Sequence, residues 1–114
     1  MVSISSLELG ANLFSGELSF GCNSLTTTLI QIDVTYNQLT GTIPSSLAQC
    51  TSMVILGLGN NHFTGPISSV FRNLTDLSDI NLSYNELSGS IPAYLNVLPS
   101  LLILLLNDNR LSGP

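Results

Sequence analysis

The stretch YNQLTGTIPSSL, residues 36–47, returns 48 positions later as YNELSGSIPAYL, residues 84–95. Midway between them stands NNHFTGPISSVF, residues 60–71, a looser copy with its asparagine, glycine and isoleucine in the same places. The chain therefore repeats one short pattern every 24 residues. A period of this length indicates a small supersecondary unit that is copied and stacked, so the fold follows from the repeat.

Five asparagines anchor this repeat, and they are separated by 25, 24, 24 and 24 residues: Asn12, Asn37, Asn61, Asn85 and Asn109. Apolar residues stand three, five and eight positions before each of them, and glycine stands four positions after. Alternating apolar residues have the period of a β-strand with one buried face. One short strand cannot bury that face alone, so successive coils must stack and share a core. We expect the asparagines to form a structural ladder, in which each amide bonds backbone groups of its own and neighbouring coils.

LIQIDVTYNQLTGTIPSSLAQCTS, residues 29–52, resembles the plant-type 24-residue leucine-rich repeat, LxxLxLxxNxLxGxIPxxLxxLxx. The resemblance implies an α/β fold, a leucine-rich repeat solenoid shaped as a right-handed horseshoe with a parallel β-sheet on its concave face. It also implies 3-10 turns and short second strands on the convex face. It covers the whole chain, 1–114, as a single domain with repeats at about 4–28, 29–52, 53–76 and 77–100 and a partial repeat at 101–114.

Both ends of this domain are expected to be uncapped, because neither carries the polar cap that terminal repeats normally need. Exposed strand edges at residues 3–9 and 101–106 would then allow self-association. No signal peptide is visible after Met1. We therefore expect an extracellular or cell-surface location if the chain is part of a longer protein, and a cytosolic one if it is complete. The longest apolar run, LLILLL, is far shorter than the roughly 20 residues that span a bilayer, which argues against direct membrane insertion.

The composition excludes several classes of protein. Hydrophobic residues make up 44% of the chain and charged residues only 8%, with a net charge of −5. Such hydrophobicity is incompatible with a disordered chain. Arg72 and Arg110 are the only basic residues besides one histidine, so the chain cannot neutralise a run of phosphates and is not expected to bind nucleic acid. Solubility must come from Ser, Thr, Asn and Gly, as in many secreted glycoproteins.

The two cysteines and the single histidine are interpreted as structural residues. Cys22 and Cys50 occupy positions that apolar residues fill in other repeats, which favours two buried free thiols. A disulfide between adjacent coils is the alternative. His62 follows a repeat asparagine at an exposed position and has no neighbouring ligand set, so no metal or other cofactor is expected. No serine, histidine and aspartate stand out as a catalytic group, and we expect no enzyme activity.

Candidate binding residues are the outward positions of the strands, which vary while the buried frame does not. Tyr36 and Tyr84 are candidate anchors because tyrosine combines apolar area with a polar tip. Apolar residues also gather toward the C-terminal repeats, at Val54, Ile55, Leu102, Ile103 and Leu105, as a candidate contact patch or as strand surface that needs a further repeat. Drift of a solvated face would explain the same variation. The candidate ligand-binding residues are Asp33, Thr35, Tyr36, Asn60, Asp79, Asn81, Ser83, Tyr84, Asn107 and Asp108.

Two N-glycosylation sequons are present, Asn73-Leu-Thr and Asn81-Leu-Ser. Asn73 is expected on the convex side, where a glycan would be harmless. Asn81 is expected in the middle of the concave face, where a glycan would obstruct binding.

The resemblance implies a non-catalytic protein or peptide recognition module, part of a plant receptor-like kinase or receptor-like protein ectodomain or of a secreted inhibitor. The acidic residues favour a partner with some basic character. The alternative is a structural module that stacks with other coils or with copies of itself. Ice binding ranks third, because the row Gly10, Thr35, Gly59, Ser83 and Asn107 is too irregular.

Overall fold

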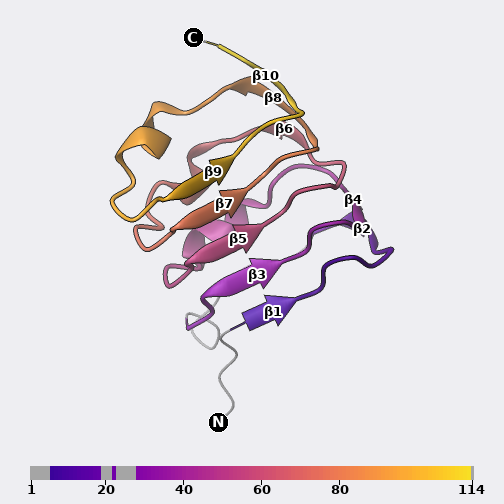
Figure 1. Cartoon of the computed structure of the whole chain (residues 1–114), viewed down its shortest axis with the longest axis horizontal. Helices are drawn as coiled ribbons and strands as arrows, with labels where there is room; N and C mark the ends of the chain where they lie inside the picture. The colour runs from indigo at the N-terminus through magenta and orange to yellow at the C-terminus, as the bar shows by residue number, and fades with distance from the viewer. Residues whose placement is uncertain (1–5, 19–21, 23–27, 114) are drawn as a thin grey trace.

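The computed structural model describes residues 6–18, 22 and 28–113. In this part of the chain, short strands and 3-10 helices follow one another in a repeating order and form stacked coils (Figure 1). The stack measures 45 × 34 × 20 Å along its principal axes. This arrangement is the predicted solenoid, and the predicted fold class is confirmed.

One strand from each coil contributes to a five-stranded parallel sheet, labelled β1, β3, β5, β7 and β9 in Figure 1. Neighbouring strands pair in register, so that Leu7 lies opposite Ile32 and Ile32 lies opposite Leu56. The middle residue of each strand packs into the core because it belongs to the alternating apolar set. The strands are β1 (Ser6–Glu8), β3 (Gln31–Asp33), β5 (Ile55–Gly57), β7 (Asp79–Asn81) and β9 (Ile103–Leu105).

The return path of each coil contains a second short strand, and in three coils a 3-10 helix, as the resemblance implied. Strands β2 (Ser15–Glu17) and β4 (Gln38–Thr40) pair in parallel, and β6 (Thr64–Pro66), β8 (Glu86–Ser90) and β10 (Arg110–Ser112) form a three-stranded parallel sheet. The helices are η1 (Ser45–Gln49), η2 (Ser69–Phe71) and η3 (Ala93–Val97). Among the described residues, no helix has the length and apolar character needed to cross a membrane.

We call the five-stranded sheet the first sheet. Each coil leaves it through one residue with left-handed backbone geometry, directly before the repeat asparagine. The φ angles are between 56° and 59° at Ala11, Tyr36, Asn60, Tyr84 and Asp108. Asparagine and aspartate tolerate this conformation, whereas a bulky residue such as tyrosine rarely adopts it. The sequence pattern did not predict the left-handed geometry of this turn, because the position holds four different residue types: alanine, tyrosine, asparagine and aspartate.

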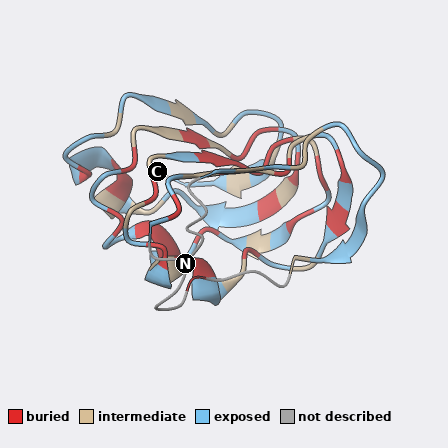
Figure 2. Ribbon diagram, turned by 90° about the horizontal axis from the view of Figure 1, so that it is seen from below, coloured by how far each residue is buried: buried red, intermediate tan, exposed pale blue. Residues whose placement is uncertain are grey.

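The core lies inside the coils, enclosed by the first sheet, the second strands and the 3-10 helices, and the buried segments are red in Figure 2. Phe63 and Phe71 are its largest fully buried members. The central coils are buried most completely, whereas leucines of the first and last coils are only partly covered. Other buried apolar residues include Leu29, Ile32, Leu47, Met53, Leu56, Leu58, Leu74, Leu77, Ile80, Leu82 and Leu87.

Cys22 and Cys50 form a disulfide with a Cα–Cα distance of 4.9 Å, and both are buried. The expectation of two free thiols is therefore wrong, and the alternative of a bridge between adjacent coils holds. The physical reason lies in the stacking. The position that corresponds to Cys22 in the next repeat is Leu47. Cys50 follows Leu47 by about one turn of a 3-10 helix. The two cysteines thus meet from neighbouring coils even though they occupy different positions of the repeat.

Candidate functional site

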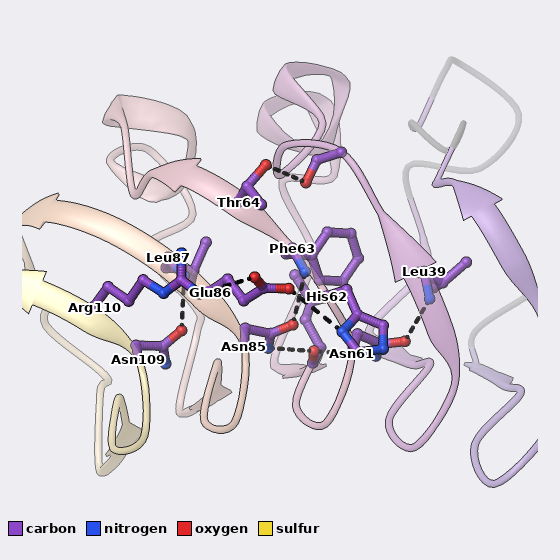
Figure 3. A network of polar contacts seen from close by, with 12 residues as sticks. Leu39, Asn61, His62, Phe63, Thr64, Asn85, Glu86, Leu87, Asn109 and Arg110 are labelled. Carbon is purple, nitrogen blue, oxygen red and sulfur yellow. Dashed lines mark hydrogen bonds and ion pairs between the residues drawn. The ribbon is translucent and has the colours of Figure 1, made fainter.

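The frame behind the candidate site is held by the asparagine ladder. Asn61 is buried, and its Nδ2 donates to the carbonyls of Leu58 and Gly59 in its own coil and of Val34 in the preceding coil. Its Oδ1 accepts a hydrogen bond from the backbone N–H of Leu39 at 3.0 Å. Figure 3 shows the same contact at Asn85 and Asn109, so each amide joins two coils. Asn37 repeats the pattern, whereas within the described part of the chain Asn12 bonds only carbonyls of its own coil.

The exposed face of the first sheet carries the outward side chains in straight rows, because the strands pair in register. We call these rows the first rung and the second rung. The first rung consists of Ser6, Gln31, Ile55, Asp79 and Ile103. The second rung consists of Glu8, Asp33, Gly57, Asn81 and Leu105. A partner that lies across the strands would therefore meet a varied series of residues in each row, with isoleucine twice in the first rung and a glycine in the second.

Two side chains of the second rung are fixed by the same local contact. Asp33 Oδ1 accepts from the backbone N–H of Thr35 at 3.0 Å and from its hydroxyl at 2.7 Å. Asn81 Oδ1 accepts from the N–H of Ser83 at 3.0 Å and from its hydroxyl at 2.6 Å. The carboxylate and the amide therefore have equivalent positions on β3 and β7, with charge as their main difference.

A shallow hollow of about 330 Å³ lies between these two residues, over β5. We call it the β5 hollow. A Cβ atom on Gly57 would approach Asp33 Oδ1 to 3.0 Å, and one on Gly59 would approach Asn81 Oδ1 to 2.9 Å. These glycines therefore let the neighbouring polar side chains lean inward over β5. The hollow is also lined by Ile55, Asp79, Ile103 and Leu105.

The predicted binding residues divide into three groups in the structure. Asp33, Thr35, Asp79 and Asn81 line the β5 hollow. The turn residues Tyr36, Asn60, Tyr84 and Asp108 form a separate row after the strands, and the two tyrosines are 63% and 52% exposed. Ser83 is buried, with its hydroxyl bonded to Asn81, and exposed Asn107 donates to Asp108 Oδ2 at 2.7 Å.

The exposed face of the first sheet and the return path of the coils differ in their charges. The described residues of the first sheet's exposed face include the carboxylates Glu8, Asp33 and Asp79 and no Lys, Arg or His. The basic groups lie elsewhere. Arg110 and His62 approach Glu86 at 3.3 Å and 3.4 Å on the return path (Figure 3). Within the described ranges, no three His, Cys, Asp or Glu side chains gather closely enough to hold a metal ion.

A second surface feature, on the η2 and η3 side, was not predicted from the repeat pattern. The Tyr94 hydroxyl donates to the Ser68 carbonyl at 2.6 Å, and the Arg72 guanidinium lies 5.8 Å from the Tyr94 ring centre. Burial raises the pKa of Tyr94 above its usual value, against smaller opposing effects of a backbone hydrogen bond and of Arg72. The arrangement anchors one coil to the next.

The two sequons occupy different environments. Asn73 is exposed just after η2, in a position that a glycan could occupy without contact with the first sheet. Asn81 is half-buried on the second rung, with its amide directly over Gly59. A glycan on Asn81 would cover the β5 hollow.

Known proteins with similar sequences are plant receptors. The chain is 37% identical over 63 residues to Receptor-like protein kinase 7 of Arabidopsis thaliana, covering 55% of this chain and 6% of that protein. It is 36% identical over 78 residues to Receptor-like protein 36 of the same plant, covering 68% of this chain and 10% of that protein. The chain thus spans a tenth or less of these relatives.

A solved structure supports the same relationship. The plant peptide hormone receptor RGFR1, in complex with RGF2, superposes with a TM-score of 0.88 at 35% sequence identity, over 96% of this chain and 17% of that one. The family model described as Leucine Rich Repeat matches residues 28–50, 52–74 and 76–98, more than half of the chain. With the in-register coils and the asparagine ladder, these matches lead to one conclusion: the chain belongs to the Leucine Rich Repeat family.

Proposed function

We propose that this chain is a non-catalytic recognition module that binds a protein or peptide on the exposed face of its first sheet. The observation that carries the proposal is the pair of rungs, where a regular frame of five in-register strands presents residues that vary from strand to strand. Varied side chains on a constant scaffold are typical of binding surfaces in repeat proteins. The similarity to a plant receptor solved with a peptide hormone supports a peptide or protein partner.

We further propose that the chain acts outside the cell or at its surface, as one domain of a longer protein. The Cys22–Cys50 disulfide supports this location, because disulfides persist mainly in oxidising compartments. The exposed Asn73 sequon supports it as well. Intact mass of the natural protein, measured before and after glycan removal, tests the proposal. A large glycosylated species is expected, and an unmodified species of 12.1 kDa would contradict it.

A random peptide-display library, selected on the immobilised natural-length protein, tests the binding face. Enriched peptides should lose at least tenfold in affinity for an Ile55→Glu variant, which places a charge at an exposed position of the first rung. They should bind normally to the control Val97→Glu, which places the same charge at an exposed apolar residue of η3, away from the first sheet. Failure to enrich any peptide, or enriched peptides that respond only to the control, would overturn the proposal.

A further inference from the structure

We infer that the partner is an extended peptide that crosses the strands, with a basic side chain over β3 and an apolar side chain over β9, about four residues apart. This inference rests on the proposed function and deepens it by naming the ligand class. Three observations carry it: a polarity gradient along the second rung, an unpaired carboxylate oxygen at one end, and the β5 hollow in the middle.

The second rung changes from acidic to apolar along the stack. Glu8 and Asp33 place two carboxylates on neighbouring strands. Gly57 then contributes no side chain, Asn81 contributes a neutral amide, and Leu105 contributes an apolar one. A ligand that lies along this row would meet opposite chemistry at its two ends.

The acidic end of the second rung, at Glu8 and Asp33, can bind a cationic group. Both hydrogen bonds that Asp33 accepts go to Oδ1, which leaves Oδ2 without a partner among the described residues. Glu8 lies opposite Asp33 on β1, about 4.8 Å away along the sheet, and is exposed. A guanidinium or ammonium group can contact both carboxylates, and charge-assisted bonds of this kind are the stronger hydrogen bonds.

The apolar end lies on β9. Ile103 and Leu105 point outward from this strand and are 46% and 43% exposed. Ile55 extends the apolar surface toward the β5 hollow. Asp79 interrupts it on the first rung, where it accepts a bond from the Ser78 hydroxyl at 2.9 Å. An aliphatic or aromatic ligand side chain would lose water contact here, at about 25 cal/mol per Å² of apolar surface covered.

Strand geometry sets the distance between the two ligand side chains. Three strand intervals separate β3 from β9, or about 14 Å at about 4.8 Å each. An extended peptide advances about 3.3 Å per residue, so about four residues cover this distance. Alternate side chains of such a peptide share one face, and the one midway between the two ends falls over the β5 hollow. There the Nδ2 of Asn81, which donates no hydrogen bond within the described part of the chain, is available to a ligand carbonyl.

The test uses synthetic peptides with one arginine and one leucine, separated by two to six positions in a Gly/Ser background, in both orders. Binding to the immobilised natural-length protein should be strongest when the two residues are about four positions apart. Replacing arginine by citrulline, its neutral isostere, should weaken the best peptide about two- to fivefold. A flat spacing profile, or absence of binding by every peptide, would overturn the inference.

Asp33→Asn separates charge from shape, because Asn81 already shows that an amide forms the same contacts at this position. Asp33→Asn alone should reduce the preference for arginine, and the double variant Glu8→Gln/Asp33→Asn, which removes both carboxylates, should bind arginine and citrulline peptides equally. The matched control Asp76→Asn, an exposed residue outside the first sheet, should keep the preference for arginine. If the preference survives in the double variant, the ligand assignment is wrong. The proposed function fails separately, if the library enriches no peptide or if the enriched peptides ignore Ile55→Glu, so the two failures are distinguishable.

Discussion

Two coils of this molecule share the same repeat pattern and differ sharply in burial. LELGANLFSGEL, residues 7–18, and LGLGNNHFTGPI, residues 56–67, agree at both leucines, two glycines, the asparagine and the phenylalanine. Yet Phe63 is fully buried and Phe14 is 48% exposed. The difference shows that burial in this fold belongs to the stack, because a coil acquires its interior only from the coils on either side.

Hydrogen bonding follows the same rule. Asn61 joins its own coil to the preceding one, whereas the described contacts of Asn12 stay within its own coil. Among the described residues, no coil lies on the outer side of β1. The same repeat asparagine thus joins two coils at one position of the stack and bonds only within its own coil, among the described contacts, at the other.

Removing the phenylalanine ring should have the largest effect. Phe63→Ala is expected to lower the free energy of unfolding by about 3–5 kcal/mol, because it leaves a cavity in the core. Phe14→Ala should lower it by about 1 kcal/mol, since half of that ring already contacts water. Urea unfolding of both variants measures the difference. Phe63→Leu is the control, because Leu39 and Leu87 occupy this position in adjacent coils, and equal losses for the two alanine variants would contradict the comparison.

Opening the Cys22–Cys50 disulfide should have the next largest effect. The bridge closes a segment with a sequence separation of 28, and its removal is expected to lower stability by about 3–4 kcal/mol. The loss should be concentrated in the first coil. On reduction, or in a Cys22→Ala/Cys50→Ala variant, the amide of Leu9 should exchange hydrogen faster, while that of Leu58 changes little. Labelling of the unreduced protein by a thiol reagent would show that the bridge is absent.

Truncation of the ladder asparagines should also destabilise the protein to different extents in the two coils. Asn61→Ala leaves the Leu39 N–H without its side-chain partner and removes one of the two side-chain hydrogen bonds to the Val34 carbonyl, at a cost of about 2–3 kcal/mol. Asn12→Ala should cost less than about 1 kcal/mol, because its carbonyl partners are accessible to water. Thermal unfolding measures both. A comparable loss in Asn12→Ala would mean that the ladder acts within a coil and does not depend on its neighbours.

The smallest expected effect is the gain in stability when asparagine occupies the left-handed turn, and it should be the same in both coils. Tyr84 and Ala11 have left-handed backbone geometry that asparagine tolerates better, as Asn60 shows at the equivalent position. Tyr84→Asn and Ala11→Asn should each raise the free energy of unfolding by about 1 kcal/mol. This strain is local, so neighbouring coils should not change the gain. Chemical denaturation is the measurement, and a gain restricted to one coil would show that the turn depends on stacking.

The frame could be predicted from sequence because its rules are local and repeated. Leucines at alternate positions before Asn61 are enough to place a strand, its buried face and the turn after it. The unequal burial of Phe14 and Phe63 could not be predicted from the repeat pattern, because it depends on which coils surround each ring. Left-handed turns escaped prediction for another reason: tyrosine and alanine occupy that position as well as Asn60.

The disulfide and the β5 hollow required distances between coils. Cys22 and Cys50 occupy different repeat positions, and only the stacked structure brings them to a Cα–Cα distance of 4.9 Å. Gly57 reads as one more variable residue in the sequence. Its importance depends on Asp33 and Thr35, whose side chains lie against it, while Asn81 lies over Gly59. The order of the acidic, amide and apolar residues along the second rung could be predicted, because they share one position of the repeat, but the hollow between them could not.

The hydrogen bonds of the first sheet run from coil to coil, and this has a mechanical consequence. A force that pulls the two ends of the stack apart loads these bonds along their own direction, so they break one coil at a time. Each coil of 24 residues would release about 80 Å of chain as it extends. The Cys22–Cys50 crosslink removes one such length from the extensible chain. The solenoid is therefore expected to respond to tension as a stepwise spring, with its first two coils locked together.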